Sequence, residues 1–133
     1  MKRFGLSANE RIKSRKDFEE IFLNGKTIFS SDKKIKATYL IVKKNGKKSG
    51  VLISAAVFKK AGKAVWRNRL KRLIKEAYRL NKEILKETAI ESGLILKLVF
   101  TPSTLNEKKN KKIYFSEVMP GVREILLKLK DKL

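Results

Sequence analysis

The segment Lys59–Arg79, with the sequence KKAGKAVWRNRLKRLIKEAYR, constrains the fold most strongly because it predicts a turn followed by a helix with two different faces. At 100° per residue, apolar residues recur on one side of this helix at the spacing of a buried stripe. These residues are Trp66, Leu70, Leu73, Ile74 and Ala77. We therefore expect this side of the helix to face the protein core.

The opposite side of the same helix is crowded with positive charge. Between Lys63 and Arg79 there are seven Lys or Arg residues and one acid, Glu76. A solvent-exposed helix normally alternates acids and bases one turn apart. Like charges at this spacing destabilise the helix by about a few tenths of a kcal/mol per pair. The sequence tolerates this cost, which indicates a polyanionic partner. The polar series is Asn68, Arg72, Lys75 and Arg79, with Lys71 beside it and Arg67 and Arg69 on its flanks.

Composition supports the same class of partner. The chain has 133 residues, 42% of them hydrophobic, which predicts one domain over residues 1–133 with residues 1–9 as an arm whose order stays open. A formal charge of +21 attracts nucleic acid or an anionic membrane surface. The sequence has no cysteine, no signal peptide and no apolar run of about 18 residues, so we expect a cytoplasmic protein without a membrane span.

The first half of the chain predicts one helix and three strands. Ser14 caps a helix over Arg15–Leu23, which Gly25 ends. A short extended piece and a turn follow, and then residues 35–42 alternate as a strand. Asn45–Gly46 predicts a hairpin, with residues 50–58 as the returning strand.

After the basic helix, which extends to about Glu87, the pattern predicts one strand and one helix. Leu94–Phe100 is almost continuously apolar, as in a strand that is covered on both faces. A lysine-rich loop over residues 104–112 precedes a last helix, which Ser116 caps and which runs to about Lys130. The order of helices and strands is α-β-β-β-α-β-α, and it predicts a layered α/β or α+β domain.

Signatures of catalysis by the protein are scarce. The chain has no histidine, and none of its thirteen carboxylates pairs with another as an acid and base. Gly62-Lys63 lacks the upstream glycine and the following Ser or Thr of a phosphate-binding loop. We therefore expect no catalytic residue and no metal site on the protein alone.

Several interpretations of the charged and aromatic residues stay open at this point. The basic face solubilises the protein, binds nucleic acid phosphates, or lies on an anionic membrane, and an RNA-binding module without an enzyme partner fits it as well. Phe18, Phe22 and Tyr39 line a groove between the first helix and the sheet, where unpaired bases stack, or they are ordinary core.

Two stretches resemble the protein subunit of bacterial ribonuclease P. The stretch FKKAGKAVWRNRLKRLIKEAYR carries the family's Lys-Lys pair, its Gly, an Ala-Val pair, Arg-Asn-Arg and a Lys-Arg pair. The upstream stretch RIKSRKDFEEIFLNGK is similar to the family's first helix, with two phenylalanines and a closing glycine. Together the similarity extends from about Arg11 to Phe100. The chain departs from the family pattern at Ser54, Phe58 and Thr101.

The resemblance implies a ribonucleoprotein that removes the 5′ leader from precursor tRNA. Its RNA subunit is the catalyst and holds most of the Mg²⁺, and the protein, a monomer on its own, binds both that RNA and the leader. The implied fold is a mixed sheet with helices, in which the basic helix lies in a left-handed crossover. The leader-binding residues that the resemblance implies are Phe18, Phe22 and Tyr39, and Phe58 is a further candidate. The implied RNA-subunit-binding residues are Lys59, Lys60, Lys63, Arg67, Asn68, Arg69, Lys71, Arg72, Lys75 and Arg79.

Overall fold

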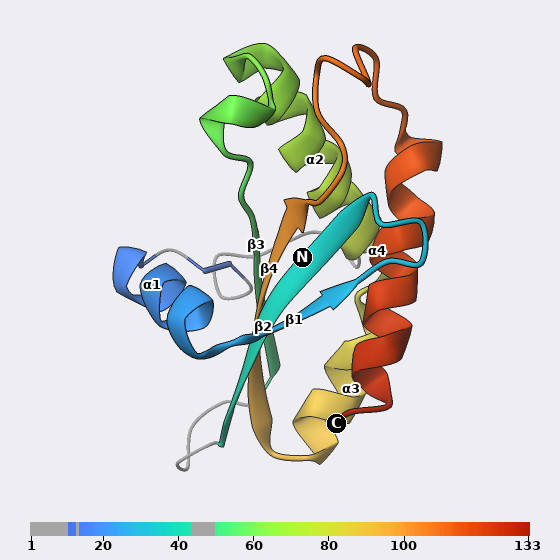
Figure 1. The fold of residues 1–133 in the computed structure, drawn as a ribbon. Coiled ribbons are helices and arrows are strands. Elements are labelled where there is room, and N and C mark those ends of the chain that lie inside the picture. The colour runs from blue at the N-terminus through green and yellow to red at the C-terminus, as the bar shows by residue number, and fades with distance from the viewer. Residues whose placement is uncertain (1–10, 13, 44–49) are drawn as a thin grey trace.

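The computed structural model describes residues 11–12, 14–43 and 50–133, arranged as one four-stranded sheet with helices on both faces (Figure 1). The predicted arm at residues 1–9 and the predicted turn at Asn45–Gly46 lie outside the described residues. The elements are α1 (Arg15–Asn24), β1 (Lys26–Phe29), β2 (Ile35–Lys43), β3 (Gly50–Ala55), the 3-10 turn η2 (Lys59–Ala61), α2 (Ala64–Asn81), α3 (Glu83–Glu91), β4 (Leu94–Pro102) and α4 (Phe115–Lys130).

The predicted order of elements is confirmed, with one addition. The long basic helix is interrupted at Lys82, so that α2 and α3 follow each other where one helix to about Glu87 was expected. Lys82 itself keeps helical backbone angles and is only 3% exposed. The fold is therefore of the α+β class, with the helices and strands in the predicted sequence.

The pairing of the strands differs from the predicted hairpin. The strand order is β1-β2-β4-β3, so β4 lies between β2 and β3. β4 pairs antiparallel with β2 and parallel with β3. The expectation that β3 returns along β2 is therefore wrong. The physical reason is burial: β4 is the most continuously apolar strand, and only a central position covers both of its faces.

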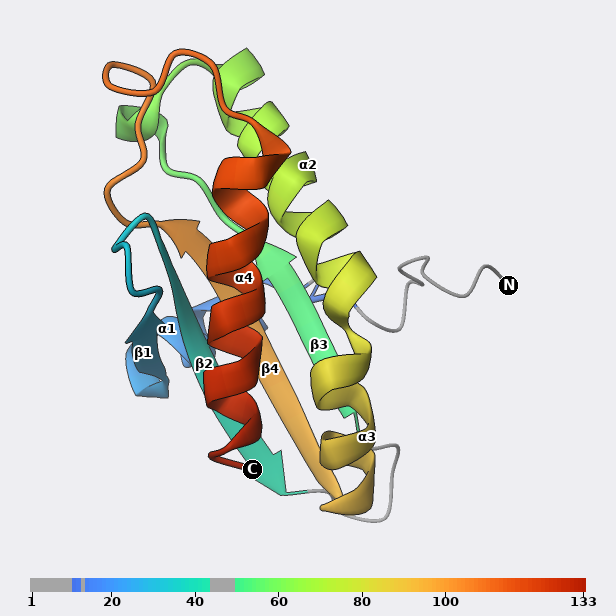
Figure 2. The ribbon, with the colours of Figure 1, turned by 90° about the vertical axis from the view of Figure 1, so that its right-hand side faces the viewer.

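The connection from β3 to β4 through α2 and α3 is left-handed. In Figure 2 the helices face the viewer, both strands point upward, and β4 lies to the left of β3. Right-handed crossovers account for about 98% of such connections, so this one is an exception to the general rule. It confirms the handedness that the family resemblance implies.

The two faces of the sheet carry different cores. α2, α3 and α4 cover one face, and α1 covers the other (Figure 1). The alternation predicted for β2 is confirmed, because Ile35, Ala37 and Tyr39 join the larger core under the helices. Leu40 packs on the smaller core, which contains Ile21 of α1. The sheet therefore separates the protein into a thick helical side and a thinner side, where α1 and Ile12 pack on the smaller core.

Local contacts fix the ends of α1 as the sequence predicts. The Ser14 hydroxyl accepts from the amides of Lys16 and Asp17, and the Gly25 amide donates to the Ile21 carbonyl at 2.7 Å. Lys97 of β4 lies 3.2 Å from Asp17, which ties the helix to the sheet below it. α1 is therefore held at both ends and on its inner face.

The start of α4 differs from the prediction by two residues. Tyr114, and not Ser116, occupies the N-cap position, and the Glu117 carboxylate accepts from the Tyr114 amide at 3.3 Å. The contact between Glu117 and the Tyr114 amide caps the helix one turn upstream, so the helix begins at Phe115. Within the described residues, no helix is long and apolar enough to span a membrane.

Candidate nucleic-acid interface

The basic helix α2 buries its apolar stripe and exposes its polar one, as predicted. Trp66, Leu70, Ile74 and Ala77 are buried in the large core, and Leu73 is half-buried against it. Away from this stripe, Asn68, Arg69 and Arg72 are exposed, and four further cations are half-buried: Arg67, Lys71, Lys75 and Arg79. The helix thus carries a row of cations on the outside of the protein.

The protein does little to neutralise this row. Arg79 pairs with Glu76, the one acid of α2. The Nε atoms of Arg67 and Arg69 donate to backbone carbonyls, at 3.0 Å in each case, which orients the side chains but leaves their charge uncompensated. Among the described residues, no ion pair joins Arg67 or Arg72 to a carboxylate.

Lys75 shows how closely the cations are packed. Its partial burial lowers its pKa, and the charges of Arg11 and Lys71 lower it further. Arg11 was not among the predicted site residues; a bridge between Arg11 and Ile53 of β3 brings it to this surface. The sequence offers no periodic signal for this placement, because Arg11 lies before the first regular element. A bound polyanion would relieve the repulsion between these groups.

Three more lysines extend the cationic surface around the start of α2. Lys59 and Lys60 form the exposed turn η2, and Lys63 is the exposed N-cap residue of the helix. They follow directly on Phe58, which is 55% exposed. The predicted Lys-Lys turn and the basic helix are therefore one continuous surface.

Aromatic residues gather on the other side of the sheet, next to α1. Phe22 is 43% exposed and its ring centroid lies 6.4 Å from that of Phe58. Phe18 is half-buried and packs on the smaller core with Ile21. A cleft of about 460 Å³, lined in part by Phe58 and Lys36, continues from this pair toward the loop after β4. The structure therefore brings together three of the four predicted aromatic residues.

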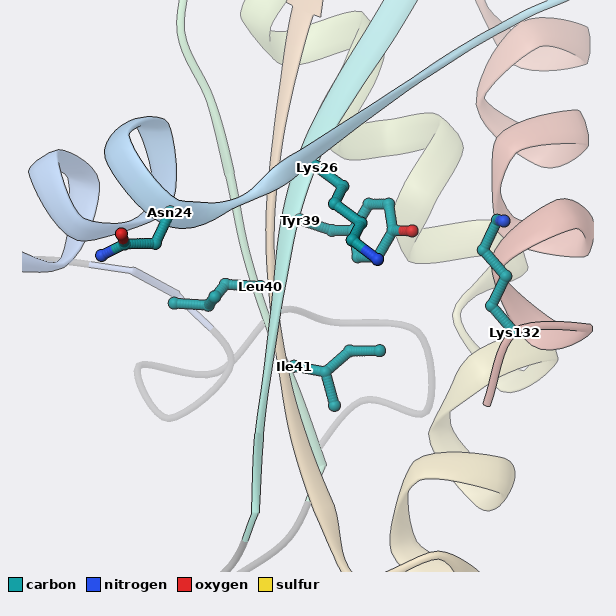
Figure 3. A pocket seen from close by; sticks show the side chains of 6 residues that line it. All are labelled: Asn24, Lys26, Tyr39, Leu40, Ile41 and Lys132. Atoms are coloured by element: carbon teal, nitrogen blue, oxygen red, sulfur yellow. The ribbon is translucent and has the colours of Figure 1, made fainter.

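Tyr39 is the exception. Its ring points away from α1 toward α4, whereas the neighbouring Leu40 points toward α1 (Figure 3). Tyr39 is 7% exposed and borders a separate pocket with Lys26 and Lys132. The prediction that Tyr39 shares a groove with Phe18 and Phe22 is wrong, because successive residues of a strand face opposite sides. Thr38 is the β2 residue on the α1 side at this level.

The carboxylates of the described residues do not assemble a site. No group of three or more Asp or Glu residues lies close enough together there to hold a metal ion. The acids that make contacts hold the fold together: Asp17 and Glu20 approach Lys97, and Glu124 pairs with Lys128.

A mixed sheet with a row of cations on one side and exposed aromatic rings beside α1 on the other is an α+β domain suited to binding nucleic acid. Comparison with known proteins identifies the family. A sequence profile of the Ribonuclease P family matches residues 6–117. The chain is 35% identical over 118 residues to the ribonuclease P protein component of Clostridium kluyveri, covering 89% of this chain and 92% of the relative.

Two further proteins agree with this assignment. The ribonuclease P protein component of Dictyoglomus turgidum is 43% identical over 88 residues, which are 66% of this chain and 68% of the relative. The solved structure of the Thermotoga maritima RNase P protein superposes with a TM-score of 0.63 at 30% identity, over 93% of this chain and 97% of that one. The chain belongs to the ribonuclease P protein family, and it is the protein component of an endoribonuclease that matures tRNA 5′ ends and whose RNA subunit carries the catalysis.

Proposed function

We propose that the outer face of α2, together with η2, binds the catalytic RNA subunit, and that the groove beside α1 binds the 5′ leader of precursor tRNA. The observation that carries this proposal is the row of cations on α2, in which, among the described residues, Arg67 and Arg72 form no ion pair with a carboxylate. The proposed RNA-binding residues are Lys59, Lys60, Lys63, Arg67, Asn68, Arg69, Lys71, Arg72, Lys75 and Arg79, with Arg11 added from the structure.

Phosphate is the ligand that such a surface fits best. Each phosphate that a cation neutralises releases counterions from the RNA, so binding weakens steeply as salt rises. Arginine adds geometry to charge, since its planar guanidinium holds two phosphate oxygens at once. The exposed Arg69 and Arg72, next to the exposed amide of Asn68, offer this geometry on one helical turn.

The groove beside α1 fits a strand with unpaired bases. Phe22 and Phe58 keep large parts of their rings in solvent, although a protein normally buries such side chains. Their tilted rings, 52° apart, leave exposed faces on which bases can stack. Lys36 beside Phe58 supplies a positive charge for the backbone of the same strand. Tyr39 lies outside this groove, and we omit it from the proposed leader-binding residues.

Five further properties belong to the same proposal. Mg²⁺ is held mainly by the RNA subunit, where it would support hydrolysis of the precursor tRNA. The protein contributes by neutralising phosphates, so the RNA should work at a lower concentration of Mg²⁺ when the protein is bound. We also expect the whole chain to act as one domain, as a monomer before assembly, and in the cytoplasm.

Site-directed cross-linking tests the two surfaces separately. A photoreactive group at position 72 should cross-link to the catalytic RNA, and one at position 22 should cross-link to the leader of precursor tRNA. Position 127 on α4, which is 45% exposed and far from both surfaces in sequence, serves as the control. Cross-links from position 72 to the leader alone, or from position 22 to the catalytic RNA alone, would contradict the assignment. In the same preparation, the protein should lower the Mg²⁺ concentration needed for cleavage.

A further inference from the structure

The loop between β4 and α4, residues 103–114, lies over the start of α2. Figures 1 and 2 both show it next to η2 and the first turn of that helix, at the end of the molecule opposite α3 and the C-terminus. The loop is rich in lysine: Lys108, Lys109, Lys111 and Lys112 are exposed. These lysines are not part of the surface proposed above, and no ion pair among the described residues joins them to a carboxylate.

Although the loop has no regular secondary structure, it is fastened to α2 and η2. The Glu107 amide donates to the Ala61 carbonyl at 2.7 Å, and the Glu107 carboxylate accepts from the Lys63 amide at 2.8 Å. The buried Trp66 donates its indole N–H to the Asn110 carbonyl at 2.8 Å. Contacts of this kind, at two points of the loop, hold its lysines in a defined position relative to α2.

Gly62 makes the close approach of the loop possible. A Cβ atom at this position would lie 2.8 Å from the Cβ of Glu107 and 2.9 Å from Cε3 of Trp66. Both distances are shorter than a normal contact between carbon atoms. The glycine ahead of the basic helix therefore lets two separate stretches of positive charge meet.

Where the loop meets α2, the surface forms an open depression of about 550 Å³. Five lysines line it, and Glu107 is the one acid among the lining residues. One oxygen of that carboxylate is already engaged by the Lys63 amide, inside the depression. Because the long helix α2 starts here, its dipole adds to the positive potential. The lysines are Lys60, Lys63, Lys108, Lys109 and Lys111.

We propose that this depression, the lysine cradle, binds a second stretch of phosphate backbone of the catalytic RNA subunit, next to the stretch that α2 binds. The inference rests on the proposed function of α2, because the cradle shares Lys60 and Lys63 with that surface. Lysine is a flexible point charge that binds phosphate without reading bases. The cradle thus adds affinity and fixes orientation, and it contributes no sequence specificity.

Removal of the loop charges tests the cradle. The variant Lys108→Ala/Lys109→Ala/Lys111→Ala removes three positive charges from exposed positions whose side chains do not fasten the loop. The matched control is Lys86→Ala/Lys130→Ala/Lys132→Ala, which removes three exposed charges at the opposite end of the molecule. The measurement is the dissociation constant for the catalytic RNA at several KCl concentrations, without precursor tRNA.

At about 0.15 M KCl the loop variant should bind the catalytic RNA about tenfold more weakly than the control variant. A plot of its log affinity against log salt concentration should have a slope that is smaller by about two to three. Equal affinities and slopes for the two variants would overturn the cradle. Weaker binding of precursor tRNA alone, with unchanged binding of the catalytic RNA, would overturn it too. Thermal melting of both variants checks that the fold is intact.

Glu107 gives a second test, because its charge and its role in fastening the loop predict opposite changes in the affinity for RNA. Glu107→Ala removes the one acid of the cradle, so charge alone predicts tighter binding of RNA. It also removes the contact to the Lys63 amide, so a fastened loop predicts weaker binding, about threefold or more for one lost hydrogen bond. Glu107→Gln keeps an acceptor and should bind as well as the unaltered protein or better. If Glu107→Ala binds as tightly as Glu107→Gln, the fastened cradle is wrong.

The outcome also separates this inference from the function on which it rests. If Arg72→Ala weakens binding of the catalytic RNA and the loop variant does not, only the cradle is overturned. If neither variant weakens it, the proposed role of α2 is overturned together with the cradle.

Discussion

The rings of Phe22 and Phe58 lie with their centroids 6.4 Å apart, at an angle of 52°, and join α1 to the segment that follows β3. Phe58 is followed directly by Lys59 and Lys60 of η2, where the cationic surface begins. The aromatic groove and the basic surface are therefore neighbours along the chain at this point. A leader strand that stacks on these rings would lie next to the RNA that α2 holds.

The first prediction concerns stacking on Phe22. Phe22→Ala should weaken binding of precursor tRNA with a leader by about tenfold in the assembled enzyme, since stacking of a base on an aromatic ring contributes roughly 1–3 kcal/mol. Binding of mature tRNA should change little. Leu23→Ala, at an 82% exposed neighbouring position, is the control. Equal losses of affinity for precursor and mature tRNA would show that the Phe22 ring has a structural role instead. Phe18→Ala is less suitable because Phe18 packs on the core.

The second prediction concerns Arg72, which is exposed in the middle of α2. Arg72→Ala should weaken binding of the catalytic RNA and reduce the salt slope by about one, because one phosphate contact is lost. Arg123→Ala on α4 removes an equally exposed charge and should leave both quantities unchanged. Titrations at four or more KCl concentrations measure the slope. An unchanged slope for Arg72→Ala would remove this residue from the interface.

The third prediction concerns the pH dependence of stability at Glu124. Hydrogen bonds from Lys128 and from Ser31 lower the pKa of Glu124 from 4.5 to about 2. Because the pKa is lower in the folded protein, the carboxylate stabilises the fold above pH 4.5, and this contribution is lost as the pH falls through 2. Glu124→Gln should therefore lower the unfolding free energy at pH 7 by about 1–2 kcal/mol, which a lower melting temperature would reveal. The difference should shrink toward pH 2.

The control for Glu124 is Glu91→Gln at an exposed position of α3, which should change the melting temperature little at either pH. The Glu124 carboxylate holds the turn between β1 and β2 through the Ser31 amide, at 2.9 Å and 3.0 Å to its two oxygens. A constant difference between the unaltered protein and Glu124→Gln from pH 7 to pH 2 would show that charge is not what this residue contributes.

The fourth prediction concerns Gly25, where α1 turns into β1. A Cβ atom here would lie 2.3 Å from the Ile21 carbonyl oxygen and 2.7 Å from that of Tyr39, and these backbone atoms cannot move aside easily. Gly25→Ala should cost about 2–3 kcal/mol of unfolding free energy, measured by urea denaturation. Gly93→Ala meets no atom within 4 Å and strains only the backbone, at φ +65°, so it should cost about 1–2 kcal/mol. The reverse order would contradict this explanation.

Local patterns in the sequence predicted those parts of the fold that depend on near neighbours along the chain. Ser14 and Gly25 delimit α1 as expected, since their contacts lie within four residues. The alternation of residues 35–42 and the apolar stripe of α2 both reappear in the core. In the candidate site, the exposed position of Arg72 and its neighbours followed from the same helical period.

Patterns also misled where a distant segment decided the outcome. The turn signal Asn45–Gly46 predicted that β3 pairs with β2. In the structure β4, which comes much later in the chain, at Leu94–Pro102, lies between these two strands. Tyr39 was grouped with Phe18 and Phe22 by residue type, although the period of its own strand placed it with Ala37 on the opposite face. The Ser116 cap was wrong, because Tyr114 occupies the N-cap position and its amide donates to the Glu117 carboxylate.

The sequence by itself determined that this protein carries a helix with one apolar and one cationic face, because helical period and charge are properties of one continuous segment. The crowded charge on that helix also favoured a polyanionic partner. The tertiary structure alone decided what adjoins that helix. Arg11 reaches Lys75 in the second half of α2, and the loop at Glu107 reaches the start of that helix, both from distant parts of the chain. The left-handed crossover and the central position of β4 bring them together, and these depend on how the whole sheet is covered, not on any single stretch.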